Sequence, residues 1–250
     1  MGRYTGLFAF GLFLAAAAVY GLLPADAPMD RPSPTDTSQA TPGPMARAPS
    51  PTAKPADPPR GKGFDFYVLA LSWSPTFCES EAAARNQDQC GDGKSFGWIV
   101  HGLWPQNEKG WPENCATPEG GRVPHAIGRD LLDIMPSMGL IGHQWRKHGS
   151  CSGLGKRDYF NLVRQASDKI QIPPEYLEPD TLLRVSPAAI EQSFIRANPG
   201  LARSGIAVTC EREKIDEIRI CLDTGLGFRA CPEVDSRSCR RTEIAIPPAR

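Results

Sequence analysis

The spacing of apolar residues over positions 64–250 predicts a domain of the α+β class. Two observations carry this prediction. Strand-like runs rich in Val, Ile, Leu and aromatic residues lie near both ends of the segment, and the patterns between them repeat every three or four residues, as amphipathic helices do. The segment is long enough to bury the core of a single domain.

The first half of this segment contains two expected strands followed by two expected helices. An apolar and aromatic run over 64–73 predicts the first strand, and residues 97–101 predict a second strand that delivers His101 at its end. Residues 127–135 and 159–170 carry apolar side chains at three- and four-residue spacing, which predicts a helix in each range.

The second half contains one expected helix and two expected strands. Ser186 and Pro187 form a good N-cap and first-turn pair for a helix that reaches about Ala197. Residues 205–210 and 215–222 then return to a strand pattern. In the second range this pattern places three apolar residues on one face: Ile218, Ile220 and Leu222.

Three of the chain's four histidines fall in two short stretches. Residues 99–105 have the sequence Ile-Val-His-Gly-Leu-Trp-Pro, and residues 143–151 have the sequence His-Gln-Trp-Arg-Lys-His-Gly-Ser-Cys. Two imidazoles that titrate near neutrality can supply a general base and a general acid, and a third imidazole with an ammonium group can hold an anion. The clustering therefore predicts an active site rather than packing positions.

The second stretch has a suitable geometry for such a site if it is helical. A rotation of about 100° per residue places four polar side chains on one arc that can face a cleft: His143, Gln144, Lys147 and His148. Trp145 falls outside this arc and is free to pack into the core. Gly149 stands where the helix would end, and Cys151 can attach the segment to another part of the chain.

A metal site is the main alternative use of the same histidines. Helical zinc pairs have histidines four residues apart, whereas His143 and His148 are five apart, and Lys147 between them would repel a cation. We therefore expect no metal. The fourth histidine, His125, lies outside both stretches, and we expect it to be a core residue whose ring is satisfied locally.

Charge and cysteine content restrict the class of protein further. Lys and Arg total 28, as do Asp and Glu, so the chain is not built to bind polynucleotide through a broad basic surface. Its 8 cysteines are even in number and contain no C-x-x-C pair, which favours a disulfide framework over a zinc or redox motif. Such a framework indicates an oxidising compartment.

The N-terminal region has the composition of an export signal followed by a linker. Arg3, an apolar run over 7–23 and the small residues 25–27 predict a signal peptide over 1–27. An uncleaved membrane anchor is the alternative, since the run is almost long enough to span a bilayer. Residues 28–63 are rich in Pro, Ala, Thr and Ser, which predicts a disordered linker that carries no chemistry of its own.

The two histidine stretches resemble the paired active-site signatures of the ribonuclease T2 family, the secreted, base-nonspecific endoribonucleases. His-Gly-Leu-Trp-Pro at 101–105 is similar to the first signature, and residues 143–151 are similar to the second. Residues 66–75, followed by Cys78, also resemble the opening strand of that family, and the resemblance covers roughly 64–240. Gln144 stands where the family usually has glutamate, so it cannot carry charge or shuttle a proton, and Ser150 mildly replaces threonine.

The resemblance implies an architecture as well as a site. The α+β domain at 64–250 would contain a central antiparallel sheet flanked by helices. Eight cysteines allow 105 pairings, so the sequence alone leaves the connectivity open. The family pattern implies four disulfides: Cys78–Cys90, Cys115–Cys151, Cys210–Cys239 and Cys221–Cys231.

The activity implied is metal-independent and cofactor-independent cleavage of single-stranded RNA through a 2′,3′-cyclic phosphate, with little base specificity. Position by position, His148 resembles the general base, His101 the general acid, His143 the phosphate ligand and Lys147 the stabiliser of the pentacovalent state. The base and acid assignments could be exchanged, because each imidazole reverses its role when the cyclic phosphate is hydrolysed. Gln144 can contribute only a hydrogen bond to the phosphate.

Trp104 resembles a residue that lines the site and stacks on a base, with a plain core position as the alternative. Trp111 lies in a loop with no pattern that supports a role. The expected partner is RNA and not DNA, the protein is expected to be a secreted or periplasmic monomer, and a membrane enters only if the N-terminal segment is uncleaved. The competing functions are a catalytically impaired binding or toxin-like protein on the same fold, and a metal-dependent hydrolase.

Overall fold

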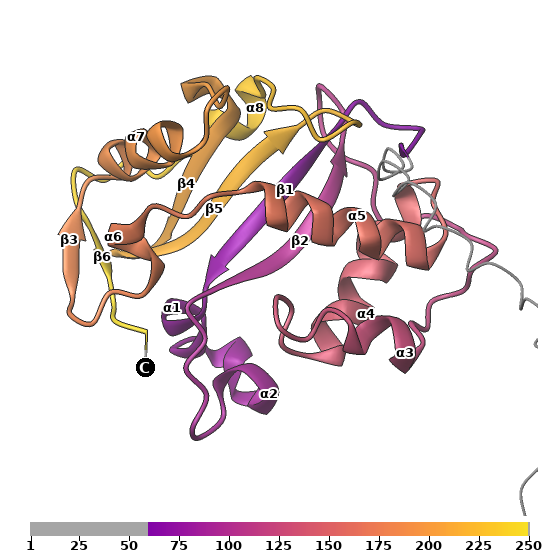
Figure 1. Cartoon of the computed structure of the whole chain (residues 1–250), viewed down its shortest axis with the longest axis horizontal. Helices are drawn as coiled ribbons and strands as arrows, with labels where there is room; N and C mark the ends of the chain where they lie inside the picture. The colour runs from indigo at the N-terminus through magenta and orange to yellow at the C-terminus, as the bar shows by residue number, and fades with distance from the viewer. Residues whose placement is uncertain (1–59, 250) are drawn as a thin grey trace, which may run out of the picture. The chain divides into compact units, whose positions relative to one another are not determined.

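The structure of the protein is a computed structural model that describes residues 60–249 (Figure 1). The signal peptide or anchor expected at 1–27, and the linker expected at 28–63 except for its last four residues, lie outside the described residues. Within the described part of the chain, no helix combines the length and the apolar character needed to cross a membrane.

The fold is built on a six-stranded sheet with the order β2-β1-β5-β6-β3, and β4 pairs with β5. All pairs are antiparallel except β5 with β6, so the sheet is mixed. The strands are β1 (Phe66–Trp73), β2 (Trp98–Gln106), β3 (Leu183–Val185), β4 (Ile206–Glu211), β5 (Lys214–Leu222) and β6 (Ile244–Ile246). The expected α+β class is confirmed, with one parallel contact added to the antiparallel sheet.

Strand β2 is longer than predicted, and His101 lies inside it rather than at its end. Its pairing with β1 shifts by one residue, because Gly102 faces Ala70 while Val100 faces Leu71. His101 is therefore the extra residue of a β-bulge, a feature that redirects a side chain. In unshifted register His101 would stand opposite Leu71, which belongs to the hydrophobic core.

The predicted helices form, one of them shortened. The structure places them in α3 (His125–Arg129), α4 (Met138–Lys147), α5 (Lys156–Lys169) and α7 (Pro187–Ala197). Ser186 caps α7 by accepting a hydrogen bond from the Ala189 backbone at 3.2 Å, as expected. The helix predicted over 127–135 ends at Arg129, and the Ile134 carbonyl accepts instead from the Val100 backbone of β2 at 2.8 Å.

The remaining helical segments are short. They are α1 (Ser74–Cys78), α2 (Gln87–Cys90), α6 (Pro174–Leu177), α8 (Pro232–Asp235) and the 3₁₀ turns Glu81–Arg85, Gly149–Cys151 and Arg203–Gly205.

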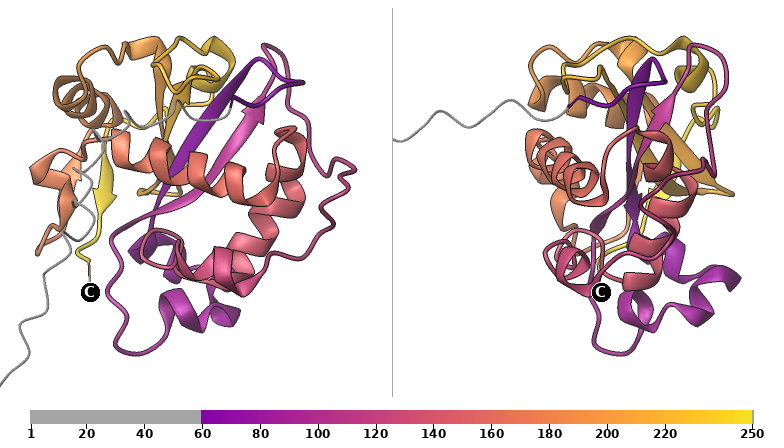
Figure 2. Two further views of the ribbon diagram at one scale, coloured as in Figure 1. Left: turned by 45° about the vertical axis from the view of Figure 1, so that its right-hand side comes forward. Right: turned by 90° about the vertical axis from the view of Figure 1, so that its right-hand side faces the viewer.

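The main core lies between one face of the sheet and the long helices. Helix α5 crosses this face in Figures 1 and 2, and its Tyr159, Phe160 and Leu162 are buried. Trp145 of α4 joins them with no exposed surface, as the helical arc predicted. The opposite face of β1 carries a smaller apolar cluster that includes Phe66 and Val68, against which Trp104 packs.

The structure contains the four disulfides that the family resemblance implied: Cys78–Cys90, Cys115–Cys151, Cys210–Cys239 and Cys221–Cys231. Cys151 follows α4 directly, and Cys115 lies in the segment after β2. Their bond joins the loop that follows β2 to the turn that follows α4, and it closes a loop whose ends are 36 residues apart. Four such bonds fit a protein that works in an oxidising compartment.

Candidate active site

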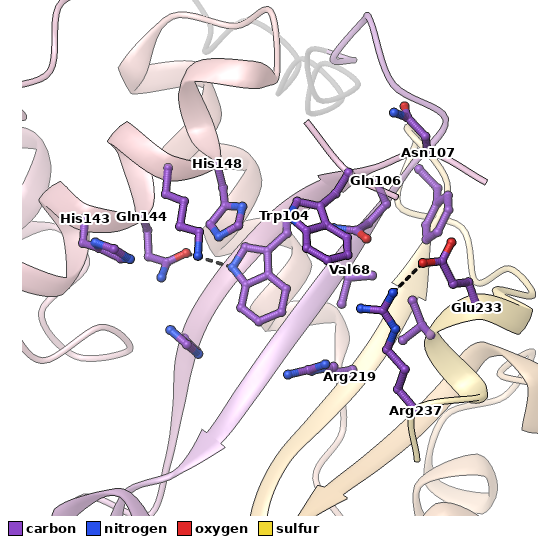
Figure 3. Close-up of a pocket in the computed structure, with 15 residues that line it drawn as sticks. Val68, Trp104, Gln106, Asn107, His143, Gln144, His148, Arg219, Glu233 and Arg237 are labelled. Atoms are coloured by element: carbon purple, nitrogen blue, oxygen red, sulfur yellow. Dashed lines mark hydrogen bonds and ion pairs between the residues drawn. The ribbon is translucent and has the colours of Figure 1, made fainter. Parts of the chain in front are cut away.

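The two histidine stretches meet at one cavity of about 340 Å³ (Figure 3). Strand β2 and helix α4 bring to it all six candidate residues: His101, Trp104, His143, Gln144, Lys147 and His148. Residues that the sequence analysis did not single out complete the lining: Phe66, Val68, Gln106, Asn107, Trp111, Arg219, Glu233, Val234 and Arg237.

His148 occupies the C-cap of α4 and is 6% exposed. Its ring stacks on Trp104 with the ring centroids 5.2 Å apart, and its Nδ1 has no hydrogen-bond partner among residues 60–249. Burial is the largest cause of a pKa lowered to about 3, and the charges of Lys147, His101 and His143 lower this pKa further. The environment of His148 therefore favours the neutral imidazole.

His101 is partly exposed and has the opposite kind of environment. Its Nδ1 is hydrogen-bonded to Oε1 of Glu217, a β5 residue whose other carboxylate oxygen accepts from Arg219 Nε at 2.8 Å. Burial by itself would raise the pKa of Glu217, but the hydrogen bond with His101 and the charges of His101 and Arg219 outweigh it and hold this pKa below its ordinary value. Glu217 is therefore an ionised carboxylate hydrogen-bonded to the His101 ring.

Trp104 links the two histidines and Gln144. Its indole Nε1 donates a hydrogen bond to Gln144 Oε1 at 2.8 Å (Figure 3). Its ring meets the ring of His101 edge-on, with the centroids 5.2 Å apart. Gln144 is 1% exposed. A Cβ at Gly102 would overlap both atoms of the Trp104–Gln144 hydrogen bond, so this position requires glycine. Trp104 thus lines the cavity and also packs on the small apolar cluster.

His143 and Lys147 lie on the more exposed side of α4. Partial burial, followed by the charges of Lys147, His101 and Arg146, lowers the pKa of His143. Lys147 Nζ lies 3.8 Å from Glu113 Oε2, and about half of each side chain is exposed. Both side chains line the cavity, where the ammonium and the imidazole N–H can donate hydrogen bonds to an anion.

The far end of the cavity is formed by loop and α8 residues that sequence analysis missed. The Arg237 guanidinium lies 5.0 Å from the ring of Trp111 and is paired with Glu233 at 2.5 Å. Trp111, which had no pattern to support a role, therefore lines the site.

His125 was expected in the core, and that expectation is wrong: it is exposed at the start of α3 and does not line the cavity.

Glu217 and Arg219 left a weak signal in the sequence. Their alternation with Ile218 and Ile220 places two charges on the strand face opposite the apolar one. What that face contacts depends on the strand order, which the sequence did not predict. Among residues 60–249 no group of three or more His, Cys, Asp or Glu side chains is placed to hold a metal ion.

The fold and the paired histidine elements place the chain in a known family. A model of the Ribonuclease T2 family matches residues 64–231, and the chain belongs to this family. A ribonuclease from Aeromonas hydrophila is 39% identical over 110 residues, which cover 44% of this chain and 48% of the relative. A probable ribonuclease from Haemophilus influenzae is 32% identical over 149 residues, 54% of each chain. The chain thus aligns with about half the length of these two relatives.

A solved structure of an RNase-related protein from Calystegia sepium has the same fold. It superposes with a TM-score of 0.62 at 24% identity and covers 76% of this chain and 100% of its own.

Proposed function

We propose that this protein is an endoribonuclease that cleaves single-stranded RNA without a metal, by transphosphorylation through a 2′,3′-cyclic phosphate and with little base specificity. One observation carries the proposal: two imidazoles of opposite environment line the same cavity, one buried with an unpartnered Nδ1 and one hydrogen-bonded to a buried carboxylate. Membership of the ribonuclease T2 family supports the same activity.

The two environments support one assignment of base and acid over its exchange. A general base must be neutral before it takes a proton, and the lowered pKa of His148 keeps it so. A general acid must be protonated, and the Glu217 carboxylate stabilises the cationic form of His101. Two titratable groups whose surroundings favour opposite charge states are typical of an acid and base pair.

The proposed reaction balances with these groups alone. His148 removes the proton from a ribose 2′-hydroxyl, and that oxygen forms a bond to the adjacent phosphorus. The bond from phosphorus to the 5′-oxygen breaks, and His101 gives its proton to the departing oxygen. His143 and Lys147 counter the charge that develops on the phosphoryl oxygens.

Gln144 takes a different part from a charged residue. Because its Oε1 accepts the Trp104 indole proton, the amide nitrogen is the end left to donate a hydrogen bond to a phosphate oxygen. Gln144 therefore also holds the tryptophan ring that stacks on His148. The role proposed for it is positional and dipolar.

Low base specificity is supported by the kind of surface at the far end of the cavity. The ring of Trp111 and the Arg237 guanidinium offer flat faces on which any base can stack. We further propose that residues 64–250 form the catalytic domain behind a signal peptide and linker, and that the protein acts as a secreted or periplasmic monomer.

A chimeric oligonucleotide tests the substrate. A DNA strand that contains a single ribonucleotide should be cut once, immediately 3′ to that ribose, in the presence of a chelator, because the nucleophile belongs to the RNA. The matched strand with a 2′-O-methyl group at that position should remain intact. Cutting of both strands at similar rates would contradict the mechanism, and binding without cutting would favour an impaired binding protein on the same fold.

A further inference from the structure

Glu217 is a buried charged residue that the reaction described above does not use. It is 4% exposed, and both of its carboxylate oxygens have partners, His101 Nδ1 on one and Arg219 on the other. A buried carboxylate is costly unless it is paired in this way. The arrangement is therefore built around the imidazole and is not a surface ion pair.

The sheet is shaped to allow this contact across an intervening strand. Strand β1 lies between β2 and β5, so a side chain of β5 reaches β2 only by passing over β1. Where Glu217 lies, β1 has two small residues: Ser72 pairs with Glu217, and Ala70 pairs with Arg219 of β5. On its other side Ala70 pairs with Gly102 of β2. These small residues leave the space through which the carboxylate meets the ring, and the bulge at His101 turns that ring toward it.

We propose that Glu217 is the positioning residue of the general acid. Its carboxylate fixes Nδ1 of His101, leaves Nε2 as the nitrogen that faces the substrate, and keeps the ring protonated until the departing 5′-oxygen takes the proton. Arg219 holds the second carboxylate oxygen, so that the carboxylate stays ionised and in place. This inference rests on the proposed ribonuclease activity and assigns a further residue to the same site.

Other titratable groups border this pair. They are Asp216 of β5, the Lys147 ammonium of α4, and the imidazoles of His143 and His148, whose lowered pKa values favour their neutral forms. Glu217 is the group of this set that is in direct hydrogen-bond contact with His101. Its carboxylate is therefore the charge whose removal should affect His101 most.

The test separates charge from hydrogen bonding with Glu217→Gln, and removes both with Glu217→Ala. Two substrates are compared, a diribonucleotide and uridine 3′-(4-nitrophenyl phosphate), whose leaving group needs no proton. Glu217→Gln should lower kcat on the diribonucleotide by about 10-fold to 100-fold, with KM nearly unchanged, and Glu217→Ala should lower it further. In both variants the basic limb of the pH–rate profile on the diribonucleotide should move to lower pH. The kcat on the aryl ester should fall by no more than about 3-fold.

Glu191→Gln is the matched control, because Glu191 is also a buried carboxylate, 6% exposed, but lies on α7 away from the cavity. It should leave both substrates and the pH profile unchanged. Glu217→Asp keeps the charge and should return the basic limb toward its wild-type position. Equal losses on both substrates with an unmoved pH profile would overturn the proposal and make Glu217 a structural residue.

A spectroscopic measurement keeps the test independent of activity and of variant folding. In the wild-type protein the His101 Nδ1 proton should give a far-downfield imidazole signal in ¹H–¹⁵N spectra, and it should vanish in His101→Gln. Absence of that signal in folded wild type overturns the contact itself. A wild-type protein that shows the signal but cuts no RNA would contradict the proposed function while leaving the Glu217–His101 pair in place.

Discussion

The acidic limb of the profile of kcat/KM against pH is expected to lie well below pH 6.5. This limb follows the free enzyme's general base, which must be neutral to act. His148 has a pKa lowered to about 3, chiefly by burial and then by the charge of Lys147. A lowered pKa of the base moves the limb to lower pH, because the neutral form persists further into acid.

The size of the effect follows from the two pKa values. At pH 5 a histidine with the ordinary value of about 6.5 is neutral in roughly 3% of molecules, whereas one with a pKa of about 3 is neutral in roughly 99%. An ordinary base would thus lose about 30-fold in kcat/KM between its plateau and pH 5. We expect His148 to keep kcat/KM at pH 5 within about 2-fold of its value at pH 6.5.

The assay is initial-rate cleavage of a diribonucleotide in chelator from pH 3.5 to 8, with circular dichroism at each pH to show that the protein stays folded. Lys147→Gln removes one of the charges that lower the pKa of His148, so it should move the acidic limb to higher pH and also slow the reaction. Substrate phosphate stabilises the imidazolium, so the limb of kcat should lie at higher pH than that of kcat/KM. A tenfold fall in kcat/KM per pH unit below 6.5, in folded protein, would refute the assignment.

Three further predictions concern residues around the same site. Gln144→Glu places a carboxylate beside His148, which should raise the pKa of His148 and move the acidic limb to higher pH. Gln144→Ala should cost about 1–2 kcal/mol of transition-state stabilisation. The pH–rate profiles of both variants check these effects. The stability that neutral His148 contributes is fully present above pH 6.5 and is lost as pH falls toward about 3. Between pH 7 and 4 the wild type should therefore lose on the order of 3 kcal/mol more unfolding free energy than His148→Gln, as measured by urea titration. Equal losses in the two proteins would contradict the lowered pKa. Replacing Cys115 and Cys151 by serine should lower stability by about 2–4 kcal/mol and reduce kcat, because this bond joins the segments that carry the histidines; an unchanged kcat would show that the bond does not position the site.

Much of the site could be predicted because it is local in sequence. The helical arc of residues 143–148 follows from rotation about one axis, and it correctly placed Trp145 in the core while its four polar residues line the cavity. The cap at Ser186 is likewise a short-range signal. The four disulfides came from the family resemblance, since spacing alone leaves the pairing open.

The parts that were missed depend on strand register and on distant partners. The bulge that frees His101 from a core-facing position arises only when β2 pairs with β1. Glu217 is 116 residues from its partner, and the two meet across β1, the strand between β2 and β5, where β1 presents the small residues Ala70 and Ser72. The helix predicted over 127–135 ends at Arg129, and the chain beyond it approaches β2, where the Ile134 carbonyl accepts from the Val100 backbone, a contact that periodicity cannot reveal.

The central claim is tested most directly by the product that forms when purified protein is incubated with single-stranded RNA in chelator. We expect fragments that end in a 2′,3′-cyclic phosphate early in the reaction, detected by mass spectrometry, and losses of activity of about 10²-fold to 10⁴-fold or more in His101→Ala and His148→Ala. Fragments that carry a 3′-hydroxyl and a 5′-phosphate, or full activity in either variant, would contradict it.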